Sequence, residues 1–107
     1  MTVYVDDMYL SPIGQFRRMK MSHMIADTEA ELHAMAALIG MRKEWYQGDH
    51  YDVALGRRRL AIGHGTVEIT YRQCALMCSV RKQTGKLPKA EVAEKIWKEL
   101  RELRKEY

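Results

Sequence analysis

Apolar and polar side chains alternate in short stretches of the chain, and a period of two predicts β-strands. In TVYVD, for example, Val3 and Val5 share one face and polar or aromatic side chains share the other. The stretch MKMSHMIA is a compact apolar run that is typical of a buried strand, and KEWYQ is short and aromatic. The predicted strands are residues 2–6, 19–26, 43–47 and 66–71.

Apolar residues spaced three and four apart predict helices in the rest of the chain. The strongest signal lies in DTEAELHAMAALIG, where Thr28 and Glu31 have the spacing of a capping box and an apolar stripe runs to Ile39. Pro88 suits the first turn of the last helix, whose apolar positions recur as far as Leu103. The predicted helices are residues 28–39, 54–63, 72–83 and 88–105.

The order of these elements predicts a small α/β fold. Strands that alternate with helices favour parallel β-α-β units with right-handed crossovers. Residues 8–18 are typical of a loop, so the first strand can pair in either direction. We expect residues 1–71 to form a mixed or parallel sheet of about four strands with flanking helices. Residues 72–107 are expected to form a C-terminal helical pair that packs on this domain or forms a dimer interface.

Charge is spread unevenly along the chain, whose formal net charge is +4. Residues 1–71 carry eight Lys and Arg against nine Asp and Glu, a balance of −1. Residues 72–107 carry ten against five, a balance of +5. A basic tail can meet the phosphates of nucleic acid, although the interspersed glutamates also favour a salt-bridged solvent face. The tail cations expected to be exposed are Lys89, Lys95, Lys98, Arg101, Arg104 and Lys105.

Composition narrows the setting in which the protein works. The sequence has no apolar run of the roughly 20 residues that a bilayer crossing needs, and the start MTVYVDD is acidic, unlike a secretory signal. We therefore expect a cytoplasmic protein with no membrane association. Cys74 and Cys78 lie four apart on a predicted helix and have no further ligand pattern around them, which favours small buried thiols in a reducing compartment.

Polar residues follow the ends of several predicted strands, where ligands bind in open α/β sheets. If these ends share one edge, Asp6, Asp27 and Asp52 form an oxygen-ligand set for Mg²⁺ or Mn²⁺. His50 and Asp52 are the candidate catalytic residues, with His50 as a base or a further ligand. The candidate ligand-binding residues are Tyr51, Arg57, Arg58, Arg59 and Arg72, of which the arginines suit phosphate oxygens.

Each of these residues also has a structural interpretation. Asp27 can support the N-terminus of the following helix, and Asp52 can cap the next one. The run Arg57–Arg59 is typical of a solvated helix face. His23 lies inside an apolar segment, which favours a hydrogen-bonded core residue over a ligand, and His33 is expected at the surface.

Four stretches in residues 1–71 resemble a family known as domain of unknown function 4031, which occurs in phages and bacteria. They are MTVYVDD, SHMIADTEAELHAMAALIG, GDHYD and GTVEIT. The family pattern has an Asp after the first strand, then S-H-x-x-x-D, E-L-H and H-Y-D. Here these are Asp6, then Ser22, His23 and Asp27, then Glu31, Leu32 and His33, then His50, Tyr51 and Asp52. The resemblance implies a small α/β domain and assigns no activity.

Three classes of function remain open from the sequence. The first is binding or metal-assisted processing of a nucleotide or nucleic acid, and an enzyme of this class would be a divalent-metal-dependent phosphoesterase or nuclease. The second is a module that holds such a ligand without turnover. The third is a phage-type interaction protein that blocks a host defence component in the host cytoplasm. The last helix, residues 88–105, has an apolar stripe that predicts a homodimer.

Overall fold

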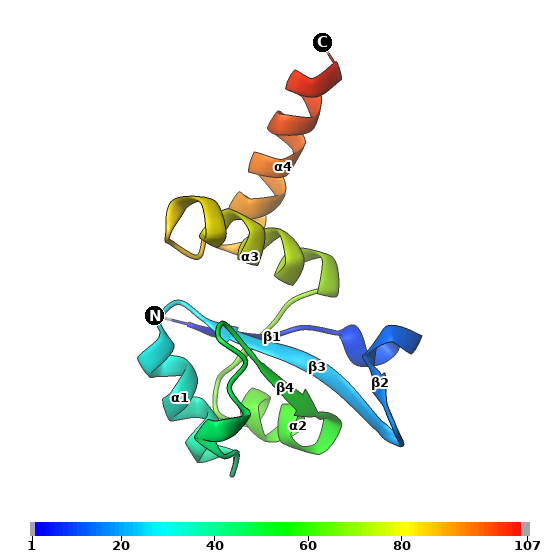
Figure 1. The fold of residues 1–107 in the computed structure, drawn as a ribbon, viewed down its shortest axis with the longest axis vertical. Helices are drawn as coiled ribbons and strands as arrows, with labels where there is room; N and C mark the ends of the chain where they lie inside the picture. The colour runs from blue at the N-terminus through cyan, green and yellow to red at the C-terminus, as the bar shows by residue number, and fades with distance from the viewer. Residues whose placement is uncertain (1, 106–107) are drawn as a thin grey trace.

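A computed structural model of the protein describes residues 2–105. Within them, five strands form a mixed sheet that lies between two pairs of helices (Figure 1). The strands are β1 (Val3–Val5), β2 (Gln15–Phe16), β3 (Met19–Ala26), β4 (Tyr51–Ala54) and β5 (Val67–Glu68). The helices are α1 (Glu29–Leu38), α2 (Leu55–Gly63), α3 (Tyr71–Thr84) and α4 (Ala90–Lys105). Short 3-10 turns lie at η1 (Met8–Leu10), η2 (Pro12–Gly14) and η3 (Lys43–Trp45).

The long strand β3 organises the sheet. It pairs antiparallel with β1, β2 and β4, whereas β1 and β5 are parallel. The predicted mixed α/β sheet and the C-terminal helical pair are therefore confirmed. The register places His23 opposite Asp52 on β4, and the backbone N–H of Asp6 donates to the carbonyl of His23.

The two faces of the sheet bury two separate cores. Helices α1 and α2 cover the face that carries Val5, Met24 and Val53. Helix α3, with the first turns of α4 packed on it, covers the face that carries Tyr4 and Ile25. Because side chains alternate along a strand, Asp6 and His23 belong to the face beneath α3. This alternation brings polar groups from three separate strands under the beginning of one helix.

Helix α3 begins and ends on strong local signals. Thr70 and Gln73 form a reciprocal capping box at its N-terminus. The backbone N–H of Tyr71 also donates to the carboxylate of Asp7, at 2.7 Å, which ties the helix to the end of β1. Gly85 ends the helix with a φ of 82°, a left-handed conformation that favours glycine. These contacts fix α3 over the polar end of β1.

The predicted third strand is wrong. Residues 43–47 contain the turn η3, in which Trp45 is largely exposed, and the strand lies further along at Tyr51–Ala54. In that strand Tyr51 and Val53 are fully buried and alternate with partly exposed Asp52 and Ala54. The expected parallel arrangement is also wrong for β3 and β4, because the connection through α1 and η3 returns the chain antiparallel.

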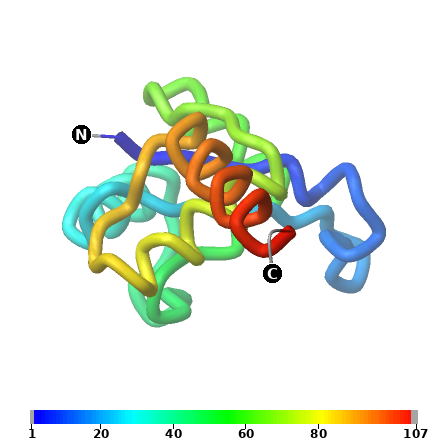
Figure 2. Tube along the Cα trace, turned by 90° about the horizontal axis from the view of Figure 1, so that it is seen from above, coloured from blue at the N-terminus to red at the C-terminus, as the bar shows by residue number. Residues whose placement is uncertain are grey.

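Helix α4 stands away from the sheet (Figures 1 and 2). Its first turns bury Ala90 and Ala93 against α3, whereas Trp97, Leu100 and Leu103 stay substantially exposed. Across residues 2–105, no helix has both the length and the apolar composition that crossing a bilayer requires.

Candidate metal centre

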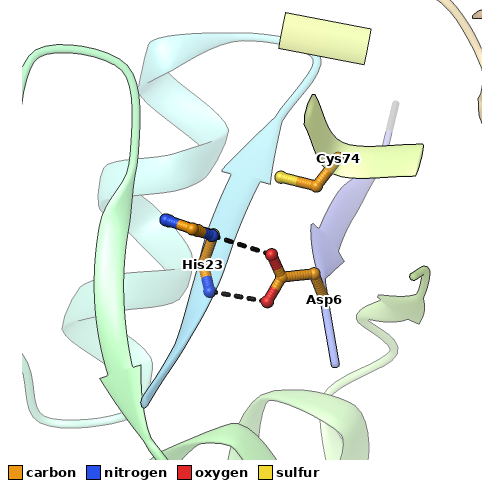
Figure 3. Close-up of side chains that lie close together, drawn as sticks. All are labelled: Asp6, His23 and Cys74. Atoms are coloured by element: carbon orange, nitrogen blue, oxygen red, sulfur yellow. Dashed lines mark hydrogen bonds and ion pairs between the residues drawn. The ribbon is translucent and has the colours of Figure 1, made fainter. Parts of the chain in front are cut away.

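Asp6 and His23 form a buried pair beneath α3. The Asp6 carboxylate is fully buried, and its Oδ1 accepts from the backbone N–H groups of Met8 and His23. Its Oδ2 lies 2.8 Å from His23 Nδ1 (Figure 3). A buried carboxylate is costly unless it is paired, and this hydrogen bond raises the pKa of His23 despite the opposing effect of burial. Because a carboxylate oxygen accepts, Nδ1 is the donor in this pair, and Nε2 points away from Asp6 (Figure 3).

Asp52 on β4 and His50, which directly precedes β4, approach the same imidazole. Asp52 Oδ1 lies 3.9 Å from His23 Nε2 and 3.4 Å from His50 Nε2. The other nitrogen of His50, Nδ1, lies 2.5 Å from Asp49 Oδ1. Asp52 Oδ2 accepts from the side-chain amide of Gln47 at 2.7 Å. Both histidines therefore face one carboxylate oxygen of Asp52.

The arrangement of the two histidines matches that of metal ligands. Each ring meets a carboxylate at Nδ1, Asp6 for His23 and Asp49 for His50, and turns Nε2 to Asp52. Histidines that bind metals characteristically donate their second ring N–H in this way. One donor atom from each of His23, His50 and Asp52 lies within 4.8 Å of the other two. We call these three residues the candidate metal centre.

Bond lengths test whether an ion would fit. Tetrahedral ligands at about 2.1 Å from zinc lie about 3.4 Å from one another. His50 Nε2 already lies 3.4 Å from Asp52 Oδ1, and a shift of about half an ångström would bring His23 Nε2 from 3.9 Å to the same separation. The three protein ligands leave further coordination positions for water or substrate.

Electrostatic pairing holds the metal-free cluster together. The hydrogen bond to Asp52, joined by that to Asp49, raises the pKa of His50 to about 9. The hydrogen bond from His50 in turn lowers the pKa of Asp52. Burial alone would raise the pKa of Asp49, but the hydrogen bond from His50 and the nearby positive charges of His50, Arg81 and Lys82 together lower it. The raised pKa values of His23 and His50 favour the protonated rings beside these carboxylates, and a divalent ion would displace the protons from the two Nε2 atoms.

A cleft of about 200 Å³ opens beside the candidate metal centre. The side chains of His23 and His50 are 24% and 23% exposed, so both reach the cleft and remain partly shielded. The ring of Tyr71 stacks on His23, with a centroid distance of 5.8 Å and an interplanar angle of 13°. Asp49 and Cys78 line the same cleft. A small ligand or water can therefore reach the two imidazoles.

Cys74 offers a second donor set with Asp6 and His23, and Figure 3 shows its sulfur on the same side as this pair. The hydrogen bond to Cys78 and burial both raise the pKa of Cys74, so its thiol keeps its proton. The Asp6 oxygen and the His23 Nδ1 are already bonded to each other. We therefore assign the metal centre to His23, His50 and Asp52. Cys74 is buried and Cys78 is half-buried.

The predicted ligands do not all converge. Asp6, His50 and Asp52 gather around His23, whereas Asp27 lies at the opposite end of β1. The Asp27 carboxylate accepts from the backbone N–H of Thr2 and from the hydroxyl of Tyr4, at 2.9 and 3.2 Å. Asp27 thus joins the ends of two strands and lies outside the cluster.

The three successive arginines of α2 point in different directions. Arg57 donates to the carbonyls of Ile39 and Gly40 at the end of α1. Arg58 is buried, and its Nε donates to the carbonyl of Asp6 at 2.9 Å. Arg59 is exposed. Helical geometry turns each residue by about 100° from the last, so one phosphate cannot meet all three.

Tyr51 and Arg72 also lie outside the candidate metal centre. The hydroxyl of Tyr51 meets His33 Nδ1 at 2.7 Å, and its ring fills the core beneath the other face of the sheet. This contact leaves His33 only partly exposed. The guanidinium of Arg72 lies 4.6 Å from the ring centroid of Trp97 on α4.

His23 is the candidate ligand that sequence reasoning missed, because its apolar neighbours favoured a core role. Two signals point to it. Alternation along residues 19–26 separates His23 from its buried neighbours Ser22 and Met24, and the S-H-x-x-x-D motif includes it. Its importance emerges only when the register places Asp52 beside it.

The part of the chain that contains this cluster matches the model of a known protein family. The model of a family described as "Protein of unknown function (DUF4031)" matches residues 3–81. The chain belongs to the DUF4031 family. In this DUF4031 protein the matched range contains Asp6, His23, His50 and Asp52, and it extends past residue 71 into α3. No curated protein and no solved structure shows significant similarity to the chain.

Proposed function

We propose that this protein is a phosphoesterase that uses one divalent transition-metal ion, bound by His23, His50 and Asp52. The observation that carries the proposal is the convergence of two imidazole Nε2 atoms on Asp52 Oδ1. Imidazole ligands suit Zn²⁺, and Mn²⁺ follows Zn²⁺ as an ion that accepts the carboxylate oxygen and binds nitrogen and oxygen donors more tightly than Mg²⁺, so we favour these two ions. Asp6 and Asp49 act as positioning residues, since each orients one histidine.

The chemistry follows from the open coordination positions. A divalent ion held by His23, His50 and Asp52 would act as a Lewis acid that lowers the pKa of water, and so would make the water oxygen a nucleophile toward a phosphoester phosphorus. A P–O bond forms to this oxygen while the P–O bond to the ester alcohol breaks. The proton released by the water returns through solvent to the departing alkoxide. The products are an alcohol and a phosphate.

The positive charge balance of the C-terminal helical pair favours an anionic substrate. Helix α3 covers this face of the sheet with the first turns of α4 packed on it, and residues 72–107 have a balance of +5. Arg81 on α3 donates to the carbonyl of Asp49 at 3.2 Å and to the sulfur of Cys78 at 3.7 Å, and both of these residues line the cleft. A basic surface raises the local concentration of phosphate-bearing ligands such as nucleotides or nucleic acid.

A second candidate is a non-catalytic interaction protein, for example a phage protein that binds a host protein. The exposed apolar side chains of Leu10, Ile13 and Phe16, which are 71%, 66% and 56% exposed, favour this class. Single exposed apolar residues are common, but three within a few residues form a candidate contact surface. This class requires no metal-dependent turnover.

We further propose that α4 forms a parallel homodimer. Ile96, Leu100 and Leu103 follow the alternating four- and three-residue spacing of a coiled-coil seam, and both leucines are about half exposed. Glu99 and Arg104 flank this seam five residues apart, the spacing at which opposite charges pair between parallel helices. A second copy of the chain therefore complements both the apolar stripe and its flanking charges.

An activity assay tests the phosphoesterase. Metal-free protein is given Mn²⁺ or Zn²⁺ with p-nitrophenyl phosphate and bis(p-nitrophenyl) phosphate. We expect metal-dependent hydrolysis by the wild type and a loss of at least about 100-fold in Asp52→Asn, because the central ligand is lost. Asp27→Asn is the matched control, since that carboxylate lies outside the cluster, and it should retain activity.

The outcomes separate the functional classes. Metal binding without turnover of any phosphoester would reject the phosphoesterase and favour a binding module. Hydrolysis that survives both metal removal and Asp52→Asn would reject the proposed centre altogether. If the protein neither binds metal nor shows turnover, the interaction class becomes the better explanation.

A further inference from the structure

A groove of about 690 Å³ lies next to the candidate metal centre and shares Asp52 with it. Its walls come from β2, β3 and the segment after α1, and they include Phe16, Met19, Met21, Met41 and Trp45. This volume lies in the range of small-molecule sites, which are mostly apolar with a few polar groups. Asp52 therefore belongs both to the candidate metal centre and to the wall of this groove.

The polar groups of the groove gather around Asp52. Gln47 lines the groove and donates its side-chain amide to Asp52 Oδ2, whereas Asp52 Oδ1 faces the two histidines. Arg57 also lines the groove, and the carbonyl of Gly40 holds its guanidinium at 2.9 Å. A ligand that fits both sites has an anionic end at the metal and an apolar end in the groove.

The walls indicate what the apolar end is. Phe16 and Trp45 contribute aromatic rings, and methionine side chains contribute thioethers that pack well on ring edges. The guanidinium of Arg57 lies 5.5 Å from the Trp45 ring centroid and stiffens this wall. Another part of the groove wall is formed by Gly14 and Met8, which pack closely on each other. A Cβ at residue 14 would lie 2.2 Å from the carbonyl oxygen of Met8, so only glycine allows this contact.

We infer that this groove binds the organic part of the substrate, and that this part is a flat aromatic ring such as a nucleobase. The inference rests on the proposed phosphoesterase, because Asp52 links the groove to the phosphate site. It adds a substrate class: aromatic phosphomonoesters, including nucleotides, in preference to sugar or alkyl phosphates.

Calorimetry with full-length protein and Mn²⁺ tests the preference. Because the protein contains two tryptophans, Trp97→Phe leaves Trp45 as the sole fluorescent indole, which reports binding in the groove. The ligands are AMP, 1-naphthyl phosphate, ribose 5-phosphate, hexyl phosphate and adenosine. We expect both aromatic phosphates to bind at least about tenfold more tightly than ribose 5-phosphate and to quench Trp45, because an aromatic contact contributes about 1.4 kcal/mol or more.

Phe16→Ala removes one wall and should weaken AMP binding about tenfold while leaving ribose 5-phosphate affinity unchanged. Val67→Ala is the control, because Val67 is an exposed apolar residue, like Phe16, but lies on β5, at the opposite end of the sheet from β2. Equal affinities for AMP and ribose 5-phosphate would overturn the inference. Hexyl phosphate binding more tightly than AMP would instead indicate an alkyl-chain ligand.

Two further outcomes separate this inference from the proposed function. If adenosine quenches the fluorescence of Trp45 but the protein binds no metal, the aromatic-binding groove is supported and the phosphoesterase is rejected. If hydrolysis depends on metal but shows no preference for aromatic substrates, the phosphoesterase is supported and the aromatic-binding groove is rejected. Concentration-dependent self-association that disappears in Phe16→Ala would assign the groove to a second copy of the chain and overturn the inference.

Discussion

Replacing Asp6 with Asn tests whether a buried carboxylate controls the metal-binding nitrogen of His23. The amide oxygen can still accept from the backbone N–H groups of Met8 and His23. The amide NH₂ group then faces His23 Nδ1, which must give up its proton in order to accept a hydrogen bond. The proton of a neutral His23 then moves to Nε2, the atom that faces Asp52, and this nitrogen loses its lone pair for a metal.

The expected magnitudes follow from these contacts. Loss of a carboxylate that orients a metal-binding histidine typically costs about 10- to 100-fold in metal affinity, which is about 1.4–2.7 kcal/mol. The charge-assisted hydrogen bond from His23 to fully buried Asp6 contributes about 1.5–3 kcal/mol to folding. A domain of this size loses about 4 °C of melting temperature per kcal/mol, so we expect a fall of about 6–12 °C in Asp6→Asn.

Titration calorimetry with Mn²⁺ and thermal unfolding measure the two effects separately. Asp27→Asn makes the same chemical change on a carboxylate that lies outside the cluster, and it should leave metal affinity unchanged. Asp6→Asn protein that stays folded and binds Mn²⁺ as tightly as the wild type would refute the role of Asp6. A common loss of affinity in both variants would point to a general loss of structure.

Three other predictions address pH, the arginine run and assembly. Because pairing with Asp52 and Asp49 raises the pKa of His50 to about 9 from 6.5 when unfolded, its stabilisation is complete below about pH 6.5 and is lost as pH rises through about 9. Urea unfolding of the metal-free protein should therefore give a higher free energy at pH 6 than at pH 9.5, and a rising profile would contradict this pairing. Arg58→Met should lower the free energy of unfolding in urea by about 2–3 kcal/mol, because Arg58 is buried and hydrogen-bonded. Arg59→Met should change this free energy by less than about 0.5 kcal/mol, because Arg59 is exposed. Equal effects of the two substitutions would contradict the structural role given to Arg58. In analytical ultracentrifugation, Glu99→Arg and Arg104→Glu should each weaken a homodimer and the double variant should restore it, whereas a monomeric wild type would reject the dimer.

Local signals in the sequence were sufficient to predict the helices. Thr28 accepts from the backbone N–H of Glu31, and the helix that follows ends at Leu38, near the predicted boundary. The helices predicted at 54–63 and 72–83 lie within a residue of α2 and α3. Caps and apolar periodicity act over a few residues, so they can be recognised without knowledge of the tertiary structure.

The third strand depended on contacts that local patterns do not show. KEWYQ has the aromatic content of a strand, but it forms a turn in which Trp45 meets Arg57 from α2. The strand instead contains Tyr51 and Val53, which β3 and the helices α1 and α2 bury completely. Pairing with β3 outweighs local propensity here.

The candidate site was predicted in part for the same reason. Asp6, His50 and Asp52 do come together, but beneath α3 on one face of a largely antiparallel sheet, not at a shared edge of parallel strands. The assumption of parallel strands brought Asp27 into the predicted ligand set and left His23 out. Only the register of β3 with β1 and β4 brings His23 between two carboxylates.

Binding of a single metal ion tests the central claim most directly. Metal-free wild-type protein is titrated with Mn²⁺ and with Zn²⁺ by calorimetry, and bound metal is counted after gel filtration. The proposed centre predicts one ion per chain in the wild type and in Asp27→Asn, and none retained in a His23→Ala/His50→Ala variant that remains folded. Wild-type protein that retains no divalent ion, or a double variant that retains one ion with unchanged affinity, would contradict the assignment of His23, His50 and Asp52 as a metal centre.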